Sequence, residues 1–281
     1  MALSPSPSDP RVRALRLAFR TVGTVAPAAA ARVAERIFCN PPASSVRPHE
    51  EAFLAAGRRF TIAAAGHRFA AWEWGAGPTV LAVHGWGSVA ARFHVLAPAL
   101  VAAGHRVVAY DGPAHGRSSG RLASLPAFAR ALEAVGRELG PLAGVVGHSL
   151  GGAAIALALR LGLRAERAVL VAPPASPVTY VNHFVDLLAI PHATRRRLQT
   201  RIERRYAIPW ADLHVPTVAR GLAVPALVVH DRGDPDVPWH DGAAIAEAWP
   251  GAELVTTEGL GHRAILRDAA VARRVTAFLA A

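Results

Sequence analysis

The sequence contains no lysine, and all 31 of its basic residues are arginine. A formal net charge of +11 would ordinarily suggest nucleic acid or an anionic surface as a partner. Arginine in place of every lysine, together with abundant alanine, is typical of codon bias in a GC-rich genome. The densest basic run, "RRRLQTRIERR" at 195–205, has Leu198, Ile202 and Tyr206 at helical spacing, so most of its arginines should lie on a solvated helix face. We therefore expect no nucleic-acid partner.

Cysteine is almost absent, since Cys39 is the only one. A single cysteine excludes an intramolecular disulfide framework, and the cytoplasm is the expected location. No run approaches the ~20 apolar residues that a membrane span needs. Arg20 interrupts the best candidate for the apolar core of a signal peptide. We expect neither a transmembrane segment nor a signal peptide.

The usual metal and nucleotide signatures are also missing. The 13 histidines show no H-x-x-x-H or H-x-x-E-H spacing of the kind that binds zinc. No G-x-G-x-x-G follows a predicted strand, which argues against a dinucleotide. The sequence predicts no metal and no cofactor.

Short apolar runs and helical stretches alternate along most of the chain. Hydrophobic residues make up 52% and charged residues 18%, as in a packed globular protein. After a hairpin turning at Ala65 and Gly66, the runs have the length of buried parallel strands joined by crossover helices. The predicted strands lie at 79–84, 106–111, 142–147, 167–172, 225–231 and 252–257. This pattern predicts an α/β fold with a mostly parallel central sheet flanked by helices.

Two segments fall outside this rhythm. Residues 1–45 are expected to be a disordered lead, "MALSPSPSDP", followed by amphipathic helices that end before the breaker "CNPPASS". Between two predicted strands, residues 173–224 leave the sheet and hold two helical stretches, too much for one crossover. We expect a helical lid at 173–224 over a core made of 46–172 and 225–281.

The pattern G-x-S-x-G, which can mark a nucleophilic serine, occurs twice, around Ser149 and around Ser118. The chemistry needs a strand that feeds a sharp turn and then a helix. Ser149 follows the strand "LAGVVG" and precedes the helical "LGGAAIALALRLG", with Gly147 and Gly151 where larger side chains would collide. Ser118 lies beyond its strand in a turn-like segment. Ser149 is therefore the predicted nucleophile.

A serine needs a base to take its proton and an acid to orient that base. In this type of fold they follow the serine in the order acid, then histidine. His262, in "TEGLGHRAILRD" after the last predicted strand, is the candidate base. Three carboxylates, Asp231, Asp234 and Asp236, follow the preceding strand within six residues, and residue chemistry alone does not choose among them.

The chain resembles the serine-dependent α/β-hydrolase-fold family of esterases and lipases over about residues 72–281. The resemblance rests on five motifs in the expected order: "HGWG", "DGPAHGRSSG", "GHSLGG", "DRGDPDVP" and "GLGH". It implies that Asp234, four residues before Pro238, is the acid, with Asp231 as its rival. It also implies that the backbone N–H groups of Trp86 and Leu150 form the oxyanion hole.

The expected function is hydrolysis of a carboxylic ester or related acyl compound through an acyl-enzyme, with a small acyl substrate as partner. Thioesterase and carbon–carbon bond hydrolase remain open as subtypes, and a non-catalytic small-ligand receptor is the alternative of a different class. The sequence does not fix the oligomeric state. Four apolar or aromatic side chains are expected to line the substrate cleft: Phe184, Leu188, Trp210 and Trp239.

Overall fold

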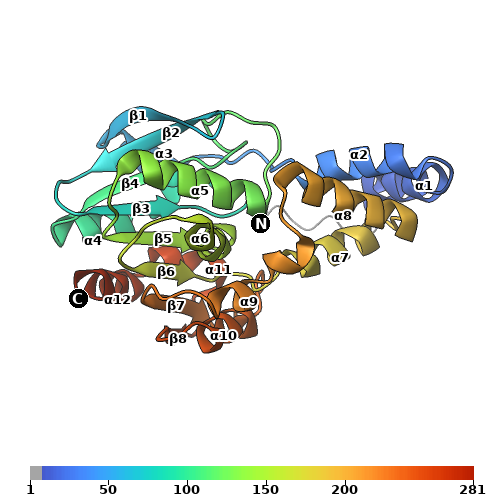
Figure 1. Cartoon of the computed structure of the whole chain (residues 1–281). Helices are drawn as coiled ribbons and strands as arrows, with labels where there is room; N and C mark the ends of the chain where they lie inside the picture. The colour runs from blue at the N-terminus through green and yellow to red at the C-terminus, as the bar shows by residue number, and fades with distance from the viewer. Residues whose placement is uncertain (1–7) are drawn as a thin grey trace.

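An eight-stranded sheet forms the centre of the computed structural model, which describes residues 8–281 (Figure 1). The strand order is β1-β2-β4-β3-β5-β6-β7-β8. The strands are β1 (Arg58–Ala64), β2 (His67–Trp74), β3 (Thr79–Val83), β4 (Arg106–Tyr110), β5 (Gly144–His148), β6 (Ala168–Val171), β7 (Ala226–Asp231) and β8 (Glu253–Thr257). The hairpin β1-β2 and the pair β2-β4 are antiparallel, and all other neighbours are parallel.

The predicted fold class is confirmed by this sheet and the helices on both of its faces. Every predicted strand is present, with ends shifted by no more than two residues. Strands β3, β5, β6 and β7 are buried along their whole length, which is why they read as continuous apolar runs instead of alternating ones. Strand β8 lies at the edge of the sheet and is only partly buried.

Four helices gather at one end of the molecule, beyond the sheet (Figure 1), and we call them the cap. They are α1 (Pro10–Val25), α2 (Pro27–Phe38), α7 (Pro177–Leu187) and α8 (His192–Tyr206). Their buried side chains form a hydrophobic cluster of their own. Within residues 8–281, no helix has the length and apolar character that crossing a bilayer requires.

The two predicted helical segments, 1–45 and 173–224, differ from expectation in detail. Residues 1–7 of the expected disordered lead lie outside the described residues, but α1 already begins at Pro10 and the Asp9 carboxylate accepts the backbone N–H of Arg11. Residues 173–224 hold α7, α8, the short η2 (Trp210–Leu213) and α9 (Val215–Ala219). Helix α9 packs on the core helices α6 and α10, so only α7 and α8 contribute to the cap.

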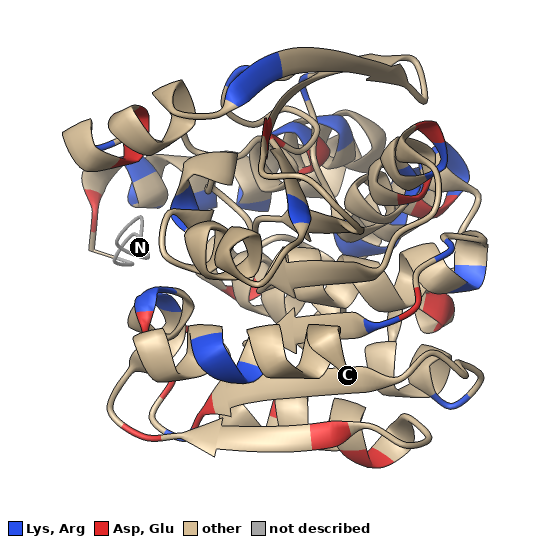
Figure 2. Cartoon of the chain, turned by 90° about the vertical axis from the view of Figure 1, so that its left-hand side faces the viewer, with Lys and Arg blue, Asp and Glu red and all other residues tan. Residues whose placement is uncertain are grey.

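Seen from the side opposite the cap, basic and acidic residues are interspersed over the chain (Figure 2). The helix α3 (Pro48–Ala55), which has no counterpart among the predicted elements, shows how they pair. Its buried Glu50 side chain accepts hydrogen bonds from the Arg92 guanidinium and from the Arg47 backbone N–H. At this helix, charge is compensated locally, since Glu51 pairs with Arg117 as well.

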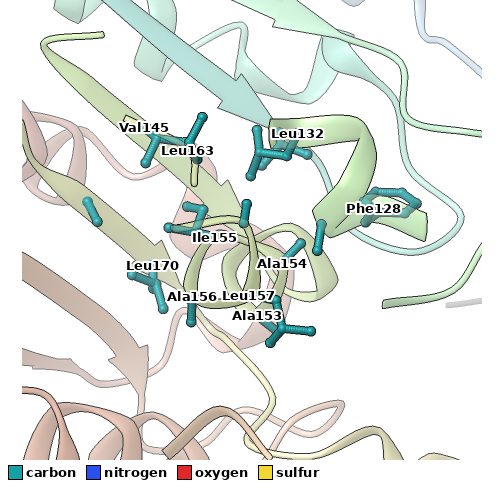
Figure 3. Close-up of a cluster of buried hydrophobic side chains, with 14 of the residues drawn as sticks. Phe128, Leu132, Val145, Ala153, Ala154, Ile155, Ala156, Leu157, Leu163 and Leu170 are labelled. Atoms are coloured by element: carbon teal, nitrogen blue, oxygen red, sulfur yellow. The ribbon is translucent and has the colours of Figure 1, made fainter. Parts of the chain in front are cut away.

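The sheet is covered on one face by α5 (Leu125–Leu139), α6 (Leu150–Leu161), α9 and α10 (Trp239–Ala248). Figure 3 shows α6 packed between α5 and the strands β5 and β6, with Ala153, Ala154, Ile155, Ala156 and Leu157 among the buried side chains. The other face is covered by η1 (Ala90–Phe93), α4 (Leu96–Ala102), η3 (Ile265–Arg267) and α12 (Ala269–Ala280). These layers fix the carboxyl ends of the strands, where the candidate site lies.

Candidate active site

The loops that follow β3, β5, β7 and β8 meet at one edge of the sheet, because these strands are parallel. They carry the predicted oxyanion residue Trp86, the nucleophile Ser149, the acid Asp234 and the base His262, respectively. Residues separated by more than 170 positions along the chain are thereby brought to one place.

Ser149 stands between β5 and α6 in a strained backbone conformation, with φ 54° and ψ −122°. The close approach of backbone segments at this turn accounts for the strained conformation. A Cβ atom on Gly147 would lie 2.5 Å from the Gly151 carbonyl carbon, and one on Gly151 would lie 2.4 Å from the Val83 carbonyl oxygen. The Ser149 N–H donates to the Val171 carbonyl oxygen at 2.8 Å, which fixes the turn to β6. The sequence predicted this role for both glycines.

Ser118, the other serine in a G-x-S-x-G pattern, is engaged in structural hydrogen bonds. Its Oγ donates to the Asp111 carbonyl oxygen at 2.6 Å and accepts the Ala70 N–H at 2.9 Å. These bonds fasten its loop to β2, so the hydroxyl serves the fold.

The His262 Nδ1 atom donates to Asp234 Oδ2 over 2.7 Å, which leaves Nε2 as the nitrogen that can accept a proton. The other carboxylate oxygen of Asp234, Oδ1, accepts the N–H groups of Asp236 (2.8 Å) and Val237 (2.9 Å). Desolvation would raise the pKa of this buried carboxyl, but hydrogen bonds from His230, His262 and Val237 outweigh it and lower the pKa. Asp234 is therefore held as a carboxylate.

The two rival carboxylates have other partners. Asp231 accepts the N–H of Gly233 at 3.0 Å, and its second oxygen accepts the Thr257 hydroxyl at 2.8 Å and the Leu260 N–H at 3.0 Å. It thus ties the end of β7 to the loop that carries the histidine. Asp236 is partly exposed, 3.8 Å from the Arg263 guanidinium. Of the three predicted carboxylates, the structure brings only Asp234 to His262.

The loop after β3 lies directly against the serine. A Cβ atom on Gly85 would be 2.8 Å from Ser149 Cβ and 3.3 Å from its Oγ. Among residues 8–281, the Trp86 N–H has no hydrogen-bond acceptor. Leu150 is the first residue of α6, so the helix leaves its N–H unpaired as well. Two unused donors therefore flank the nucleophile.

Two buried histidines fix this loop. His84 Nδ1 donates to the Gly85 carbonyl oxygen at 2.7 Å, and its Nε2 accepts the Gly112 N–H at 2.8 Å. His115 Nε2 accepts the Gly87 N–H at 3.0 Å. Desolvation lowers the pKa of each to about 4, so both stay neutral and keep one acceptor nitrogen.

A segment between α2 and α3 also touches the loop. The Ser44 hydroxyl donates to the Gly87 carbonyl oxygen, and a Cβ atom on Gly87 would lie 2.9 Å from the Pro42 ring. The chain leaving the cap therefore passes against the loop that carries Trp86.

His148, next to the serine, supports the predicted base. Its Nε2 donates to the His262 carbonyl oxygen at 2.7 Å, and the two rings lie 4.8 Å apart. Desolvation, with the neighbouring His262 ring, lowers the pKa of His148 to about 3. His148 therefore acts as a neutral donor that fixes the backbone of His262.

Two residues near the acid were not predicted from the sequence. His230 is fully buried, and its Nε2 donates to the Val237 carbonyl oxygen at 3.0 Å and lies 3.5 Å from Asp234 Oδ2. Tyr180 of α7 has its pKa raised by desolvation and by the carboxylates Asp241, Asp234 and Asp236. A histidine at the carboxyl end of a buried strand was a readable signal for the first, but nothing local pointed to the second.

Two of the predicted cleft residues lie in the cap instead. Leu188 is 3% exposed and lies within the hydrophobic cluster of the cap. Its contact with substrate stays a prediction. The Phe184 ring packs on Phe38 of α2, with ring centroids 5.2 Å apart. Residues of the N-terminal helices belong to the same hydrophobic cluster, and the sequence did not place them there.

The two predicted tryptophans lie elsewhere. Trp210 begins η2 and packs partly against both the cap cluster and the core. Trp239 begins α10, where its indole N–H donates to the Thr256 hydroxyl at 3.0 Å and the Arg232 guanidinium lies 4.7 Å from its ring. Their contact with substrate stays a prediction.

One cluster within residues 8–281 could offer ligands to a metal ion: His49, Glu50 and His94. Its buried carboxylate already pairs with the Arg92 guanidinium, and this positive charge disfavours a cation at the same oxygen.

A family model described as "Alpha/beta hydrolase family" matches residues 80–274, more than half of the chain. No curated protein sequence matches the chain.

Solved structures with the same fold include several hydrolases. The carboxylesterase CesB (YbfK) of Bacillus subtilis is 19% identical, with a TM-score of 0.63, covering 82% of this chain and 95% of that one. A thermophilic esterase of Thermogutta terrifontis is 17% identical, with a TM-score of 0.60, over 79% and 98% of the two chains. A meta-cleavage product hydrolase of Pseudomonas fluorescens is 20% identical, with a TM-score of 0.59, over 78% and 96%. At these identities the likeness shows the fold and leaves the substrate open.

Acid should unfold the protein through the buried neutral histidines His84, His115 and His148. Their folded-state pKa values of about 3 to 4 lie below the roughly 6.5 of an exposed histidine. Below about pH 6.5 the unfolded chain therefore binds protons that the folded chain does not. Their contribution to stability is complete above that pH and is lost as the pH falls toward 4, by about 1.4 kcal/mol per pH unit for each histidine.

The free energy of unfolding falls with decreasing pH at a slope that urea unfolding, followed by circular dichroism between pH 7 and pH 4, measures. His115→Gln should reduce this slope by up to about one third, with the same change at the exposed His183 as the control. A free energy of unfolding that stayed constant from pH 7 to pH 4.5 would contradict the buried neutral state of these residues.

Proposed function

Because this chain belongs to the alpha/beta hydrolase family, we propose that it is a serine hydrolase that cleaves carboxylic esters through an acyl-enzyme. The observation that carries the proposal is the 2.7 Å hydrogen bond between His262 Nδ1 and Asp234 Oδ2, beside the strained Ser149 turn. A buried carboxylate, an oriented imidazole and a serine at a helix N-terminus are the three parts that nucleophilic acyl transfer needs.

In the proposed reaction, the Ser149 hydroxyl attacks the acyl carbon while His262 Nε2 takes its proton. The carbonyl double bond opens to a tetrahedral oxyanion, and the imidazolium then gives its proton to the departing alcohol. Water attacks the resulting acyl-serine with the same base, releasing the carboxylic acid and restoring the serine. Asp234 keeps Nδ1 protonated and stabilises the imidazolium formed at each step.

The N–H groups of Trp86 and Leu150 are the proposed donors to the oxyanion. The unused state of both donors supports this role, as does the contact between Gly85 and the serine. His84 and His115 hold the first donor's loop rigid, so little reorganisation is needed when charge develops.

A neutral acyl group fits the surroundings better than a phosphorylated thioester. The α8 arginines that could select phosphate do not turn toward the serine: Arg201 and Arg205 pair with Glu35, and Arg195 donates to Asn182. The remaining α8 arginines are exposed. This arrangement favours the ester over the thioester within the same chemistry.

Labelling with a fluorophosphonate should place one adduct on Ser149 in the folded protein, because only an activated serine reacts. Mass spectrometry of the digested protein locates the adduct. Ser149→Ala should abolish labelling and Ser118→Ala should retain it. Folded protein that forms no fluorophosphonate adduct would contradict the enzyme proposal and favour a non-catalytic receptor on the same fold.

Replacing the acid should affect turnover far more than replacing its neighbours. Asp234→Asn should lower kcat by about 10³ to 10⁴-fold, because His262 loses the group that sets its tautomer. Asp231→Asn and Asp236→Asn should each cost under about tenfold, although the first should also weaken the folded state by loosening the Leu260 and Thr257 contacts. Steady-state kinetics with urea unfolding as control separates the two effects. The assignment is wrong if Asp231→Asn is folded and inactive while Asp234→Asn turns over normally.

Short to medium neutral acyl esters should be the better substrates. Each methylene buried from water contributes about 0.8 kcal/mol, so two well-packed methylenes should raise kcat/KM roughly tenfold. Butyryl and hexanoyl esters should be cleaved well at about 0.5 M salt, where phosphate attraction is screened. The double variant Arg197→Gln/Arg204→Gln should cleave them at the wild-type rate. Turnover that required a coenzyme A thioester and collapsed in high salt would replace the ester proposal by the thioesterase one.

A further inference from the structure

The helix α1 turns an uncharged face to solvent. Leu17, Thr21 and Val25 recur every four residues on the side opposite the buried Val12 and Phe19. Leu17 is 65% exposed and Val25 87% exposed. Of the nine large hydrophobic side chains exposed within residues 8–281, five belong to α1 and α2: Leu17, Val22, Val25, Val33 and Ile37. Such a concentration on one projecting hairpin indicates an interaction surface.

The threonines of this face do not present free hydroxyls. Thr21 Oγ1 donates to the Leu17 carbonyl oxygen at 3.0 Å, and Thr24 Oγ1 donates to the Arg20 carbonyl oxygen at 2.8 Å. With the hydroxyls bonded back to their own helix, the face can leave water at little polar cost.

Unpaired arginines border the uncharged face. Arg13 and Arg20 lie along one side of it, seven residues apart, and neither has an ion-pair partner among residues 8–281. Residues 10–34 contain five arginines and no acidic residue. An apolar stripe flanked by arginines alone is the pattern of helices that lie in the interface of an anionic bilayer.

The rest of the cap adds to the positive charge. A groove of about 260 Å³ between α2 and α8 is lined by Arg32, Arg197, Arg201 and Arg204, together with Ala28 and Thr200. Only Arg201 of these four has an acidic partner within the described chain, the buried Glu35. Figure 1 shows the cap projecting from the body of the molecule, so the sheet does not obstruct an approach to it. Opposite the cap, by contrast, the two signs of charge are interspersed (Figure 2).

We propose that the cap docks on anionic phospholipid bilayers, with the Leu17–Val25 face of α1 in the headgroup region and the surrounding arginines on lipid phosphates. The apolar residues supply burial, and the arginines supply the attraction that selects anionic over neutral lipid. This docking does not depend on the proposed hydrolysis, because it uses no residue of the triad.

Co-sedimentation with vesicles tests the proposal. The full chain should bind vesicles of equimolar phosphatidylcholine and phosphatidylglycerol and should bind phosphatidylcholine alone far less. Arg13→Gln/Arg20→Gln should weaken binding about 25-fold, since each arginine near such a surface contributes about fivefold. Leu17→Ser/Val25→Ser should weaken it about tenfold or more. Binding should also fall at about 0.5 M salt.

The matched control is Leu161→Ser/Leu254→Ser, which removes two other exposed hydrophobic side chains, of α6 and β8, and should leave vesicle binding unchanged. Circular dichroism checks that each variant is folded. Wild-type protein that stayed in the supernatant with both vesicle types would overturn the proposal, and so would α1 variants that bound as well as wild type. A dimer in sedimentation equilibrium that Leu17→Ser/Val25→Ser dissociates, without vesicle binding, would assign the face to a second copy instead.

Discussion

The tight turn between β5 and α6 is the constraint on which the candidate site depends. Two backbones approach so closely at Gly147, Gly151 and Val83 that no Cβ atom fits at either glycine. The chain can pass this point only through the strained conformation of Ser149, which exposes the hydroxyl at the sheet edge. Because α6 starts at the next residue, its unpaired N–H groups begin beside that hydroxyl. The proposed acid and base then need only follow parallel strands of the same sheet.

Features that depend on local sequence could be predicted well. The buried parallel strands read as apolar runs, and the serine could be chosen over Ser118 because strand, turn and helix are contiguous around it. The choice of Asp234 over Asp231 was different, since Asp231 ends β7 and Asp234 follows only three residues later. The two carboxylates differ in their hydrogen bonds in the folded chain. The oxygens of Asp231 accept hydrogen bonds from Gly233, Thr257 and Leu260. Only the family resemblance pointed to the spacing of Asp234, the carboxylate that bonds to His262.

Features that depend on distant segments could not be predicted. Leu188 is apolar, as a cleft residue would be, but it is buried in a cluster that includes residues of α1 and α2. No local sequence pattern predicts that α2, near the N-terminus, packs on α8, which begins at His192. The same holds for Tyr180, whose neighbourhood includes Asp241 of α10. Helical spacing identifies an apolar face and leaves its partner open.

The cap joins α1 and α2 to α7 and α8, two parts of the chain that the ribosome synthesises at widely separated times. Glu35 of α2 bonds to Arg201 of α8, 166 residues later. At the usual 5–20 residues per second of synthesis, α2 waits roughly 10–30 s for that partner. During the interval α2 can pack, among the cap helices, only on α1, and the Glu35 carboxylate lacks its partners Arg201 and Arg205. The cap is therefore a part of this protein that cannot assemble until both of its halves, synthesised at widely separated times, are available.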